Sequence, residues 1–346
     1  MAVPIGILLD VPAADGGNST ADMVRFAIDE VAASPAGTSL PGIELVVGMA
    51  EGHPRGTGEA VADGLRDLAA QGVIGVIGPA ISDNALACVP VADALQVPCI
   101  NWTGSEQTRS EWMFHYQVGS LEDEPFVIAR YLADHGLRRI ALVREDSFIG
   151  RQYASFFDDA VLVSGLELLG TVDLDVSGGN GAEAVAGVEA LAPDAVVYFG
   201  LGMSAPGLAE PMRGRPWPVA TNSALMFGHM NPEWRAGFEG WTYIDAFDEE
   251  NPVREQLHTR LGLALDEPGP AYTYDMGRLM ALGVAHAPSP TSEGVRDGLE
   301  RVKQVPAALG SPGTIMGFGR WKRCALEGGY LVLRQWRGGK SVRARD

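Results

Sequence analysis

Apolar runs and helical apolar spacings alternate along almost the whole chain. Short runs rich in Val and Ile, such as residues 73–78, are apolar nearly throughout, which is typical of strands buried on both faces of a parallel sheet. The segments between them carry apolar residues three or four positions apart, as in Val61, Leu65 and Leu68, which predicts amphipathic helices. This alternation of strands and helices predicts an α/β fold with parallel sheets.

Two successive halves of the chain repeat the alternation. The strands predicted in the first half are residues 4–10, 44–49, 73–78 and 98–102. The second half has predicted strands at 139–145, 168–174, 195–200 and 218–222, and predicted helices at 122–134, 151–164, 182–190 and 205–212. At 346 residues, the chain is long enough for two domains. We therefore expect two α/β lobes.

Extended segments connect the two halves. Residues 114–120 and 241–247 predict two crossovers, and the predicted strands 314–319 and 330–337 allow a third. Two long helical patterns, 272–287 and 292–302, follow the second crossover and would return to the first lobe. The expected lobes are residues 1–118 with 249–320, and residues 119–248 with 321–346. Repeated crossing predicts a hinge and a cleft that closes on a ligand.

Composition narrows the class of partner. The content is 46% hydrophobic and 20% charged, and the formal net charge is −18, which argues against a nucleic-acid partner because such binding needs clustered Lys and Arg. Basic residues do gather near the end of the chain, in Arg320, Lys322, Arg323 and 334–345, a run we interpret as a solvated edge. No stretch approaches the roughly 18 to 20 apolar residues of a membrane span, so membrane insertion is not expected.

The start of the chain and its cysteines bear on the compartment. The first predicted strand begins at once, without a basic and apolar leader. We expect a periplasmic or surface-anchored protein if a leader has been removed, and a cytoplasmic one if Met1 is the native start. The three cysteines, Cys88, Cys99 and Cys324, do not decide between these, and their odd number leaves at least one unpaired.

Small polar residues follow two neighbouring strands of the first half. Ser82 comes after the strand 73–78, and Thr103 and Ser105 come after the strand 98–102. Ligands of open α/β sheets bind outside the carboxyl ends of the strands. Hydroxyl groups and helix N-termini there can hold a carboxylate or a carbonyl without catalysis.

Signals for an enzyme are weak. Residues 200–205, GLGMSA, match a GxGxxA dinucleotide fingerprint after a strand, but the acidic residue expected about 20 positions later is missing and Pro206 follows at once. The six histidines are scattered, so no metal site is expected. Of these, His229 alone lies in a loop beyond a second-half strand, where contact with a ligand is one interpretation.

Eight segments in order give the chain a family resemblance. The segments VIGVIGP, a helix starting near Ser82, VPCINWTGS, HYQVGSLEDEP, RIALVREDSFIGR, AVVYFG, GWTYIDAF and YTYDMGRLM resemble the type I solute-binding proteins of the leucine/isoleucine/valine-binding class. The resemblance implies two Rossmann-like lobes joined by three crossovers, which capture a small polar organic ligand (an amino acid, an amide or a carboxylate) by hinge closure. It also implies an ABC-type permease as partner, no enzymatic activity and no cofactor. The alternatives are a cytosolic ligand sensor of the same fold, with a regulatory partner, and a nucleotide-cofactor enzyme that uses residues 200–205.

The resemblance also assigns candidate ligand positions. The position that holds a ligand carboxylate falls on Ser82, with Ala80 and Ile81 lining the approach. Thr103 and Ser105 follow the next strand, beside Trp102, whose indole would cover an apolar ligand face. In the second lobe the family's aromatic position is Ile149, a departure, and Phe148 beside it would serve instead. Tyr272, at the head of a helical pattern, completes the candidates of the first lobe.

The position that receives a ligand ammonium in amino-acid binders falls on Asn222. An amide cannot supply the charge that an ammonium favours, which argues against a standard amino acid unless Asp245 or Asp275 provides it. Each candidate also has a structural interpretation. Ser82 would cap a helix, Thr103 and Ser105 would cap a loop, Trp102 would fill a core, and Asn222 would form a turn.

Overall fold

The chain divides into two compact units. The computed structural model describes residues 2–11, 18–53, 55–265 and 269–344. Unit 1 comprises Met1–Val118, Glu250–Leu263 and Gly269–Tyr330, and unit 2 comprises Gly119–Glu249, Ala264–Pro268 and Leu331–Asp346. Residues 321–330, which the sequence analysis gave to the second lobe, lie in unit 1.

Unit 1 is built on a five-stranded parallel sheet. The order across the sheet is β2 (Ile43–Met49), β1 (Val3–Leu9), β3 (Val76–Ile77), β4 (Cys99–Asn101) and β5 (Met113–His115). The segment 114–120, expected to be a crossover, therefore begins inside the last strand of this sheet. The sequence analysis interpreted this segment as an extended connection, whereas its three residues are buried and pair with β4.

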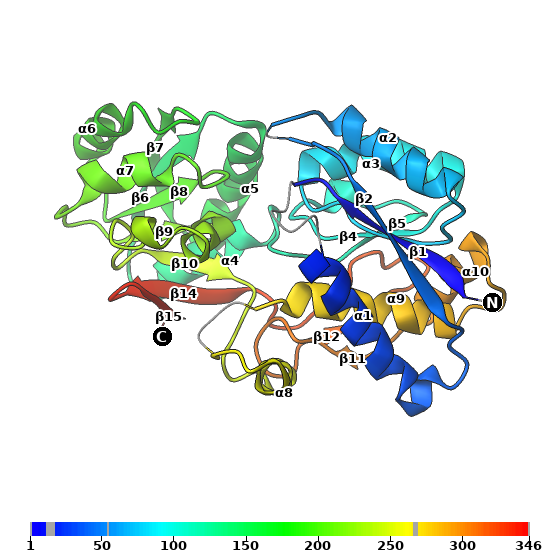
Figure 1. Cartoon of the computed structure of the whole chain (residues 1–346). Helices are drawn as coiled ribbons and strands as arrows, with labels where there is room; N and C mark the ends of the chain where they lie inside the picture. The colour runs from blue at the N-terminus through cyan, green and yellow to red at the C-terminus, as the bar shows by residue number, and fades with distance from the viewer. Residues whose placement is uncertain (1, 12–17, 54, 266–268, 345–346) are drawn as a thin grey trace. The chain divides into compact units, whose positions relative to one another are not determined.

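Helices cover both faces of this sheet (Figure 1). One face packs against α2 (Gly58–Ala70) and α3 (Ser82–Leu95), and the other against α1 (Asn18–Ala32) and α9 (Ala271–Ala285). The unit also contains α8 (Pro252–Leu261), α10 (Ser292–Leu299) and a small antiparallel sheet of β11 (Val305–Pro306), β12 (Ile315–Met316) and β13 (Leu326–Glu327). Cys88 and Cys99 are free thiols buried in the core, as is typical of cysteine used as a small apolar residue. Cys324 is free and partly exposed.

Unit 2 is built on a seven-stranded sheet. Its parallel strands follow the order β7 (Glu167–Leu174), β6 (Arg139–Glu145), β8 (Ala195–Phe199), β9 (Val219–Thr221) and β10 (Thr242–Asp245). Two antiparallel strands, β14 (Val332–Arg337) and β15 (Lys340–Arg343), extend it beyond β10. Residues 242–245, expected within a crossover, thus form a fully buried strand.

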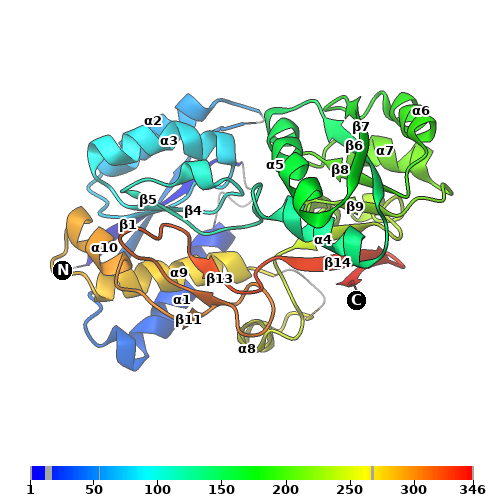
Figure 2. The same ribbon diagram turned by 180° about the vertical axis from the view of Figure 1, so that it is seen from behind.

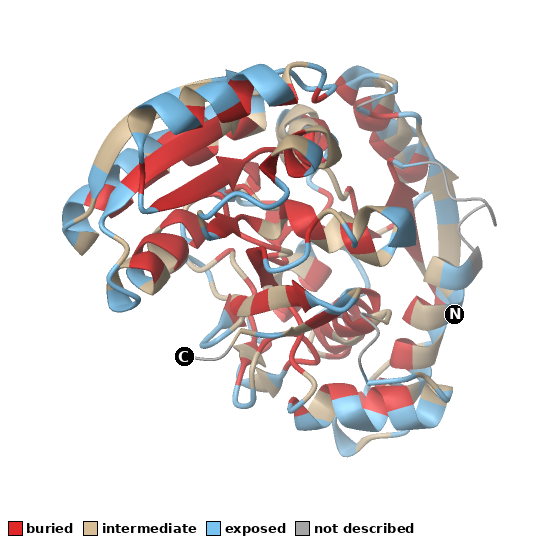
Figure 3. Cartoon of the chain, turned by 90° about the vertical axis from the view of Figure 1, so that its left-hand side faces the viewer, coloured by how far each residue is buried: buried red, intermediate tan, exposed pale blue. Residues whose placement is uncertain are grey.

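Helices cover the unit 2 sheet, which Figure 2 shows from behind. α4 (Glu124–Asp134) and α5 (Phe148–Ser164) share one core with the sheet, and α6 (Gly181–Leu191) and α7 (Ala205–Met212) share another. α5 begins three residues earlier than predicted because the Ser147 hydroxyl accepts a hydrogen bond from the backbone N–H of Gly150 at 3.0 Å. The central strands are buried, whereas the covering helices show exposed outward faces (Figure 3).

The two sheets share one topology. The order β2-β1-β3-β4-β5 in unit 1 is repeated by β7-β6-β8-β9-β10 in unit 2. The strand that starts each unit therefore lies second in its sheet, and β1 corresponds to β6, β3 to β8 and β4 to β9. The expected α/β class, with a parallel sheet in each of two lobes, is confirmed. In the described ranges, no helix combines the length and apolarity that crossing a bilayer requires.

Candidate functional site

A buried carboxylate organises the start of α3 in unit 1. Asp10, directly after β1, is 1% exposed and accepts hydrogen bonds from the backbone N–H groups of Ala80 and Ile81, both at 2.9 Å. It also accepts one from Asn84 Nδ2 at 2.8 Å. Ala80 and Ile81, expected to line the ligand approach, therefore have their N–H groups bound within the protein. The sequence analysis missed Asp10 because its partners lie about 70 residues away.

Ser82 does not occupy the N-cap position of α3 that the structural interpretation expects. Ile81 occupies the N-cap position of α3 and Ser82 is the first residue of the helix. Ser82 is 7% exposed, and its hydroxyl has no hydrogen-bond partner among the described residues. A hydroxyl without an internal partner, at the carboxyl end of β3, is available to a ligand.

Thr103 and Ser105 follow β4 but bond within the unit. The Thr103 hydroxyl donates to Asn101 Oδ1 at 3.0 Å and also lies 3.0 Å from the Thr108 hydroxyl. The Ser105 hydroxyl accepts from the backbone N–H of Gln107 at 3.3 Å and caps a short 3-10 helix. Thr103 and Ser105 are each 2% exposed. Their hydrogen bonds stabilise the loop after β4, which is the structural role that the sequence analysis gave as the alternative to ligand binding.

Trp102 and Tyr272 form an aromatic pair in unit 1. Their ring centroids lie 6.2 Å apart with the planes inclined at 31°. Trp102 is half-buried, and Tyr272 is 37% exposed at the start of α9. The backbone N–H of Trp102 donates to the carbonyl of Pro79 at 3.1 Å, which joins this loop to the one that leads to Ser82. The two aromatic candidates of the first lobe are thus brought together.

A second buried carboxylate organises the equivalent loop of unit 2. Glu145, the last residue of β6, is fully buried and accepts from the Leu201 backbone N–H at 3.1 Å and from the Ser204 hydroxyl at 2.6 Å. The Tyr198 hydroxyl donates to it at 3.2 Å. Residues 200–205 therefore already surround an internal anion. A nucleotide phosphate there would meet negative charge and would find the Leu201 donor engaged, so the dinucleotide interpretation of this motif is wrong.

Asn222 is 2% exposed and both ends of its amide are bound. Its Nδ2 donates to the carbonyl of Gly200 at 2.9 Å, and its Oδ1 accepts from the Thr221 hydroxyl at 3.1 Å. These bonds hold the loops after β8 and β9 together. A role of Asn222 in ligand contact stays a prediction.

Asp245 and Asp275, the alternative countercharges, are also engaged. Asp245 Oδ2 lies 3.1 Å from His229 Nε2, and Asp245 Oδ1 accepts from the backbone N–H of Ala246 at 2.7 Å. Asp275 accepts from the Tyr116 hydroxyl at 2.8 Å, from Arg278 at 3.1 Å and from the Ala308 N–H at 2.7 Å. Both carboxylates are buried and serve internal donors, and His229 is a partner of Asp245 within unit 2.

A third buried carboxylate of unit 2 lies at the start of a helix. Glu124, at the start of α4, is fully buried and accepts from the backbone N–H groups of Ser120 and Ser223, both at 2.7 Å. Burial raises the pKa of this carboxyl to about 7, although the two backbone donors act in the opposite direction. The hydroxyl of Tyr153 interacts with both Glu124 and Asn222. The Glu124 carboxyl is therefore connected through Tyr153 to Asn222, which is a candidate ligand residue.

Exposed apolar side chains follow several strand ends within each unit. In unit 2, Phe148 follows β6 and is 43% exposed, and Met203 follows β8 and is 51% exposed. Ile149 instead packs against the core, so Phe148 is the aromatic side chain that reaches the surface. In unit 1, Val11 after β1 is 48% exposed. Apolar groups at these edges would suit a ligand with an apolar body.

Clusters of metal-ligating side chains are absent from the described residues. No group of three or more His, Cys, Asp and Glu side chains there could hold an ion.

Comparison with known proteins places the chain in a family. Its sequence matches the family described as "Periplasmic binding protein" over residues 2–327, whereas no curated protein matches it. It is similar in structure to a periplasmic binding protein type 1 from Bordetella pertussis, with a TM-score of 0.81, 16% identity and 100% of both chains covered.

Two further solved structures are similar. An ABC transporter substrate-binding protein from Desulfitobacterium hafniense, in complex with Leu, gives a TM-score of 0.77 at 17% identity, with 99% of this chain and 100% of that chain covered. The branched-chain amino acid transporter substrate-binding protein LivJ from Streptococcus pneumoniae, in complex with isoleucine, gives 0.78 at 17% identity with the same coverage. The family match covers most of the sequence, and the chain therefore belongs to the periplasmic binding protein family, whose members are solute-binding components of transporters and not enzymes.

Proposed function

We propose that this protein captures a small organic ligand with an apolar body and a carboxylate, carbonyl or amide group, and delivers it to an ABC-type importer. The observation that carries the proposal is the Ser82 hydroxyl, which has no hydrogen-bond partner among the described residues and lies beside the loop that presents Trp102. Trp102 and Tyr272 offer a partly exposed aromatic surface, and Ser82 offers a hydrogen-bonding group. Such a combination suits an amphipathic small molecule.

Charge selects among the possible ligands. A ligand ammonium needs a carboxylate, but Asn222 is neutral, and Asp245 and Asp275 are buried and already bonded to internal donors. We therefore favour a neutral amide or a carboxylate without an ammonium over a zwitterionic amino acid. The Leu and isoleucine in two similar structures belong to proteins only 17% identical, and they define the apolar body with which to begin.

A thermal-shift series with matched compounds tests this ligand class. Leucine, 4-methyl-2-oxopentanoate and 4-methylpentanamide share one apolar body and differ in the polar end. We expect the oxo acid or the amide to raise the melting temperature more than leucine does, because a ligand stabilises the folded state by mass action. A larger shift with leucine would reject the charge argument. No shift with any of them, or with a wider panel of carboxylates, amides and sugars, would reject the proposed capture.

Hinge closure, an extracytoplasmic location and an ABC-type permease complete the proposed function. The family to which the chain belongs supports these three proposals. Small-angle scattering with and without a ligand found in the thermal-shift series would report closure as a smaller radius of gyration. Ligand-dependent binding to a permease would support transport. Ligand-dependent binding to a regulatory partner instead would support the sensor alternative.

A further inference from the structure

A basic pocket lies in unit 1, at the amino end of β5. Its volume is about 1010 Å³. Three segments line it: residues 109–111 before β5, residues 296–301 at the end of α10, and residues 320–324 before β13. The candidate ligand residues follow the carboxyl ends of strands, so this pocket is separate from them.

The pocket is positively charged within a strongly acidic chain. Six of the 26 basic residues line it, against three acidic residues. The basic residues are Arg109, Arg296, Arg301, Arg320, Lys322 and Arg323, and the acidic ones are Glu111, Asp297 and Glu300. The run near the end of the chain, interpreted from sequence as a solvated edge, thus contributes three cations to a pocket.

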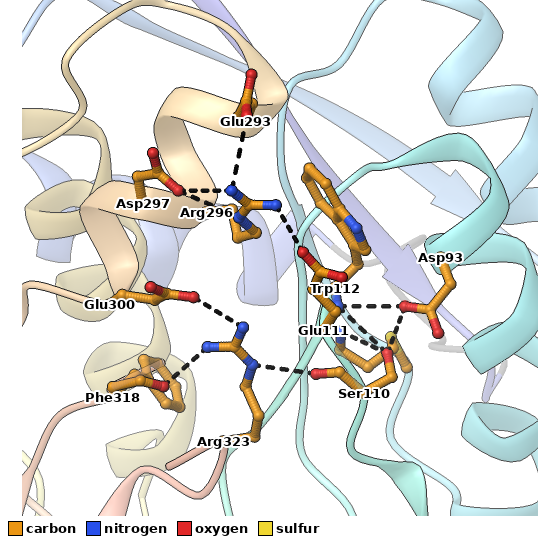
Figure 4. A network of polar contacts seen from close by, with 12 residues as sticks. Asp93, Ser110, Glu111, Trp112, Glu293, Arg296, Asp297, Glu300, Phe318 and Arg323 are labelled. Carbon is orange, nitrogen blue, oxygen red and sulfur yellow. Dashed lines mark hydrogen bonds and ion pairs between the residues drawn. The ribbon is translucent and has the colours of Figure 1, made fainter. Parts of the chain in front are cut away.

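Four of these cations form ion pairs and build the walls. Figure 4 shows the Arg296 guanidinium between the carboxylates of Asp297 and Glu111, at 2.8 Å and 2.9 Å, with its centre 4.6 Å from the Trp112 ring. Arg323, 9% exposed, pairs with Glu300 at 2.8 Å and donates to the carbonyl of Ser110 at 3.1 Å (Figure 4). The remaining pairs are Arg109 with Glu106 and Lys322 with Glu327.

Arg301 and Arg320 carry the charge that is not neutralised. Both are exposed, and neither forms an ion pair with a carboxylate in the part of the chain that the structure describes. Arg301 contacts only the carbonyl of His286, at 3.5 Å, and the Arg320 guanidinium lies 5.3 Å from the centre of the Trp321 ring. Paired walls with two unpaired guanidinium groups give the pocket a net attraction for anions.

Trp321 adds an apolar contact to this charge. It is 89% exposed, more than any other large hydrophobic side chain that the structure describes as exposed. Exposing a whole indole to water is unfavourable, and Trp and Arg are the residues that most often dominate protein interfaces. Their combination at one pocket indicates a surface that another polypeptide covers.

We propose that this basic pocket, together with Trp321, binds an acidic segment of a partner protein. Pockets for small molecules enclose their ligand and carry few charged groups, whereas this one is large, and nine of its twelve lining residues are charged. Carboxylates match the planar guanidinium groups of Arg301 and Arg320, and the methylene groups of glutamate would pack on Trp321. An anionic membrane fits less well, because its extended surface would face the whole net charge of −18.

Binding of a labelled acidic peptide tests the proposal. We expect fluorescein-labelled hexaglutamate to bind the full chain at low ionic strength, and added salt to weaken the complex. The double variant Arg301→Glu/Arg320→Glu should weaken hexaglutamate binding by about tenfold, the effect of roughly 0.7 kcal/mol from each reversed charge. Trp321→Ala should also weaken it. Arg213→Glu, at an exposed arginine of unit 2 that pairs with Glu210, is the matched control and should not.

Each contrary result overturns the proposal. Hexaglutamate that does not bind, or that binds the double variant and the wild type equally, would show that the pocket does not take acidic peptides. Phosphatidylglycerol vesicles that bind the wild type and not the double variant, without any binding of hexaglutamate, would assign the pocket to membranes. The variants should keep the thermal shift produced by small ligands, so failure here is distinguishable from failure of the proposed function.

Discussion

Asp10 and Glu145 occupy corresponding positions in the two sheets and bind corresponding loops. Asp10 directly follows β1, and Glu145 ends β6, the strand with the same place in unit 2. Each carboxylate accepts backbone hydrogen bonds from the loop after the next strand of its sheet, which is Ile81 in unit 1 and Leu201 in unit 2. Each lobe thus uses a resident anion to fix a loop at the carboxyl edge.

Loss of either carboxylate should destabilise its own unit. In Asp10→Asn, an NH2 group replaces one of the two carboxylate oxygens, so either the Ala80 or the Ile81 N–H loses its acceptor. A buried donor without an acceptor costs about 1–3 kcal/mol. We expect urea denaturation to show a loss of about 2 kcal/mol in the free energy of unfolding. Hydrogen exchange at the Ala80 and Ile81 amides should also become faster. Asp83→Asn, in the same helix turn, is the control and should change stability by less than about 0.5 kcal/mol.

Glu145→Gln should have the equivalent effect in unit 2. The carboxamide keeps a single acceptor oxygen, so it cannot accept both from the Leu201 N–H and from the Ser204 and Tyr198 hydroxyl groups. We expect a loss of about 2 kcal/mol and faster exchange at the Leu201 amide. Asp146→Asn, which removes only an exposed pair with Arg151, serves as the control. Equal stability of Glu145→Gln and the wild type would show that the carboxylate does not hold the loop.

Ser82 and Thr103 should respond oppositely to removal of their hydroxyl groups. Ser82→Ala deletes a hydroxyl without an internal partner, so stability should change by less than about 0.5 kcal/mol while ligand affinity falls about tenfold. Thr103→Val leaves Asn101 Oδ1 without one donor and should cost about 1–2 kcal/mol of stability. Calorimetric titration with the ligand and urea denaturation separate the two effects. A destabilised Ser82→Ala variant with unchanged affinity would assign Ser82 to the structure alone.

The order of elements was predictable from the sequence because it depends on local periodicity. Continuous apolar runs gave the central strands, and helical spacing gave α7 with the bounds that the structure has. β5 and β10 were predicted as extended connections, because the sequence alone does not show that these segments pair with β4 and with β9 and β14.

The roles of individual polar residues were less predictable, because their partners are far along the chain. Glu145 and Leu201 are 56 residues apart, and Glu124 and Ser223 are 99 apart. No spacing rule connects such pairs. For the same reason, the sequence alone could not distinguish Ser82 from Thr103. The Thr103 hydroxyl is hydrogen-bonded within unit 1, whereas the Ser82 hydroxyl has no partner among the described residues.

His115 should remain neutral throughout the physiological pH range. The ring is buried, Arg109 Nε donates to its Nδ1 at 3.0 Å, and Nε2 donates to the carbonyl of Thr103 at 2.7 Å. Burial lowers the pKa of His115 from 6.5 to about 3. The stability that the neutral ring provides is therefore complete above pH 6.5 and is lost as the pH falls toward 3. Nuclear magnetic resonance should find the Nε2–H tautomer and no titration of this ring between pH 5 and 8, whereas a midpoint near 6.5 would contradict the buried geometry.

Glu124 should make unit 2 less stable as the pH rises. Its pKa is about 7 in the folded chain because of burial, above the 4.5 of an exposed glutamate, so folding takes up a proton between these values. The contribution of Glu124 to the free energy of unfolding is complete below pH 4.5. It falls by about 3 kcal/mol as the pH rises through 7.

Glu124→Gln should remove this slope, because the amide does not titrate. The variant should be less stable at pH 5, since one of the Ser120 and Ser223 N–H groups loses its acceptor, and its stability should then change little up to pH 8. Urea denaturation at each pH measures the free energy of unfolding of the wild type and of Glu124→Gln. Glu122→Gln, at a partly exposed residue of the same segment, is the control. Parallel slopes for the wild type and Glu124→Gln would assign the pH dependence to other groups. Because Tyr153 connects Glu124 to Asn222, ligand affinity measured over the same range would show whether the proton also reaches the candidate site.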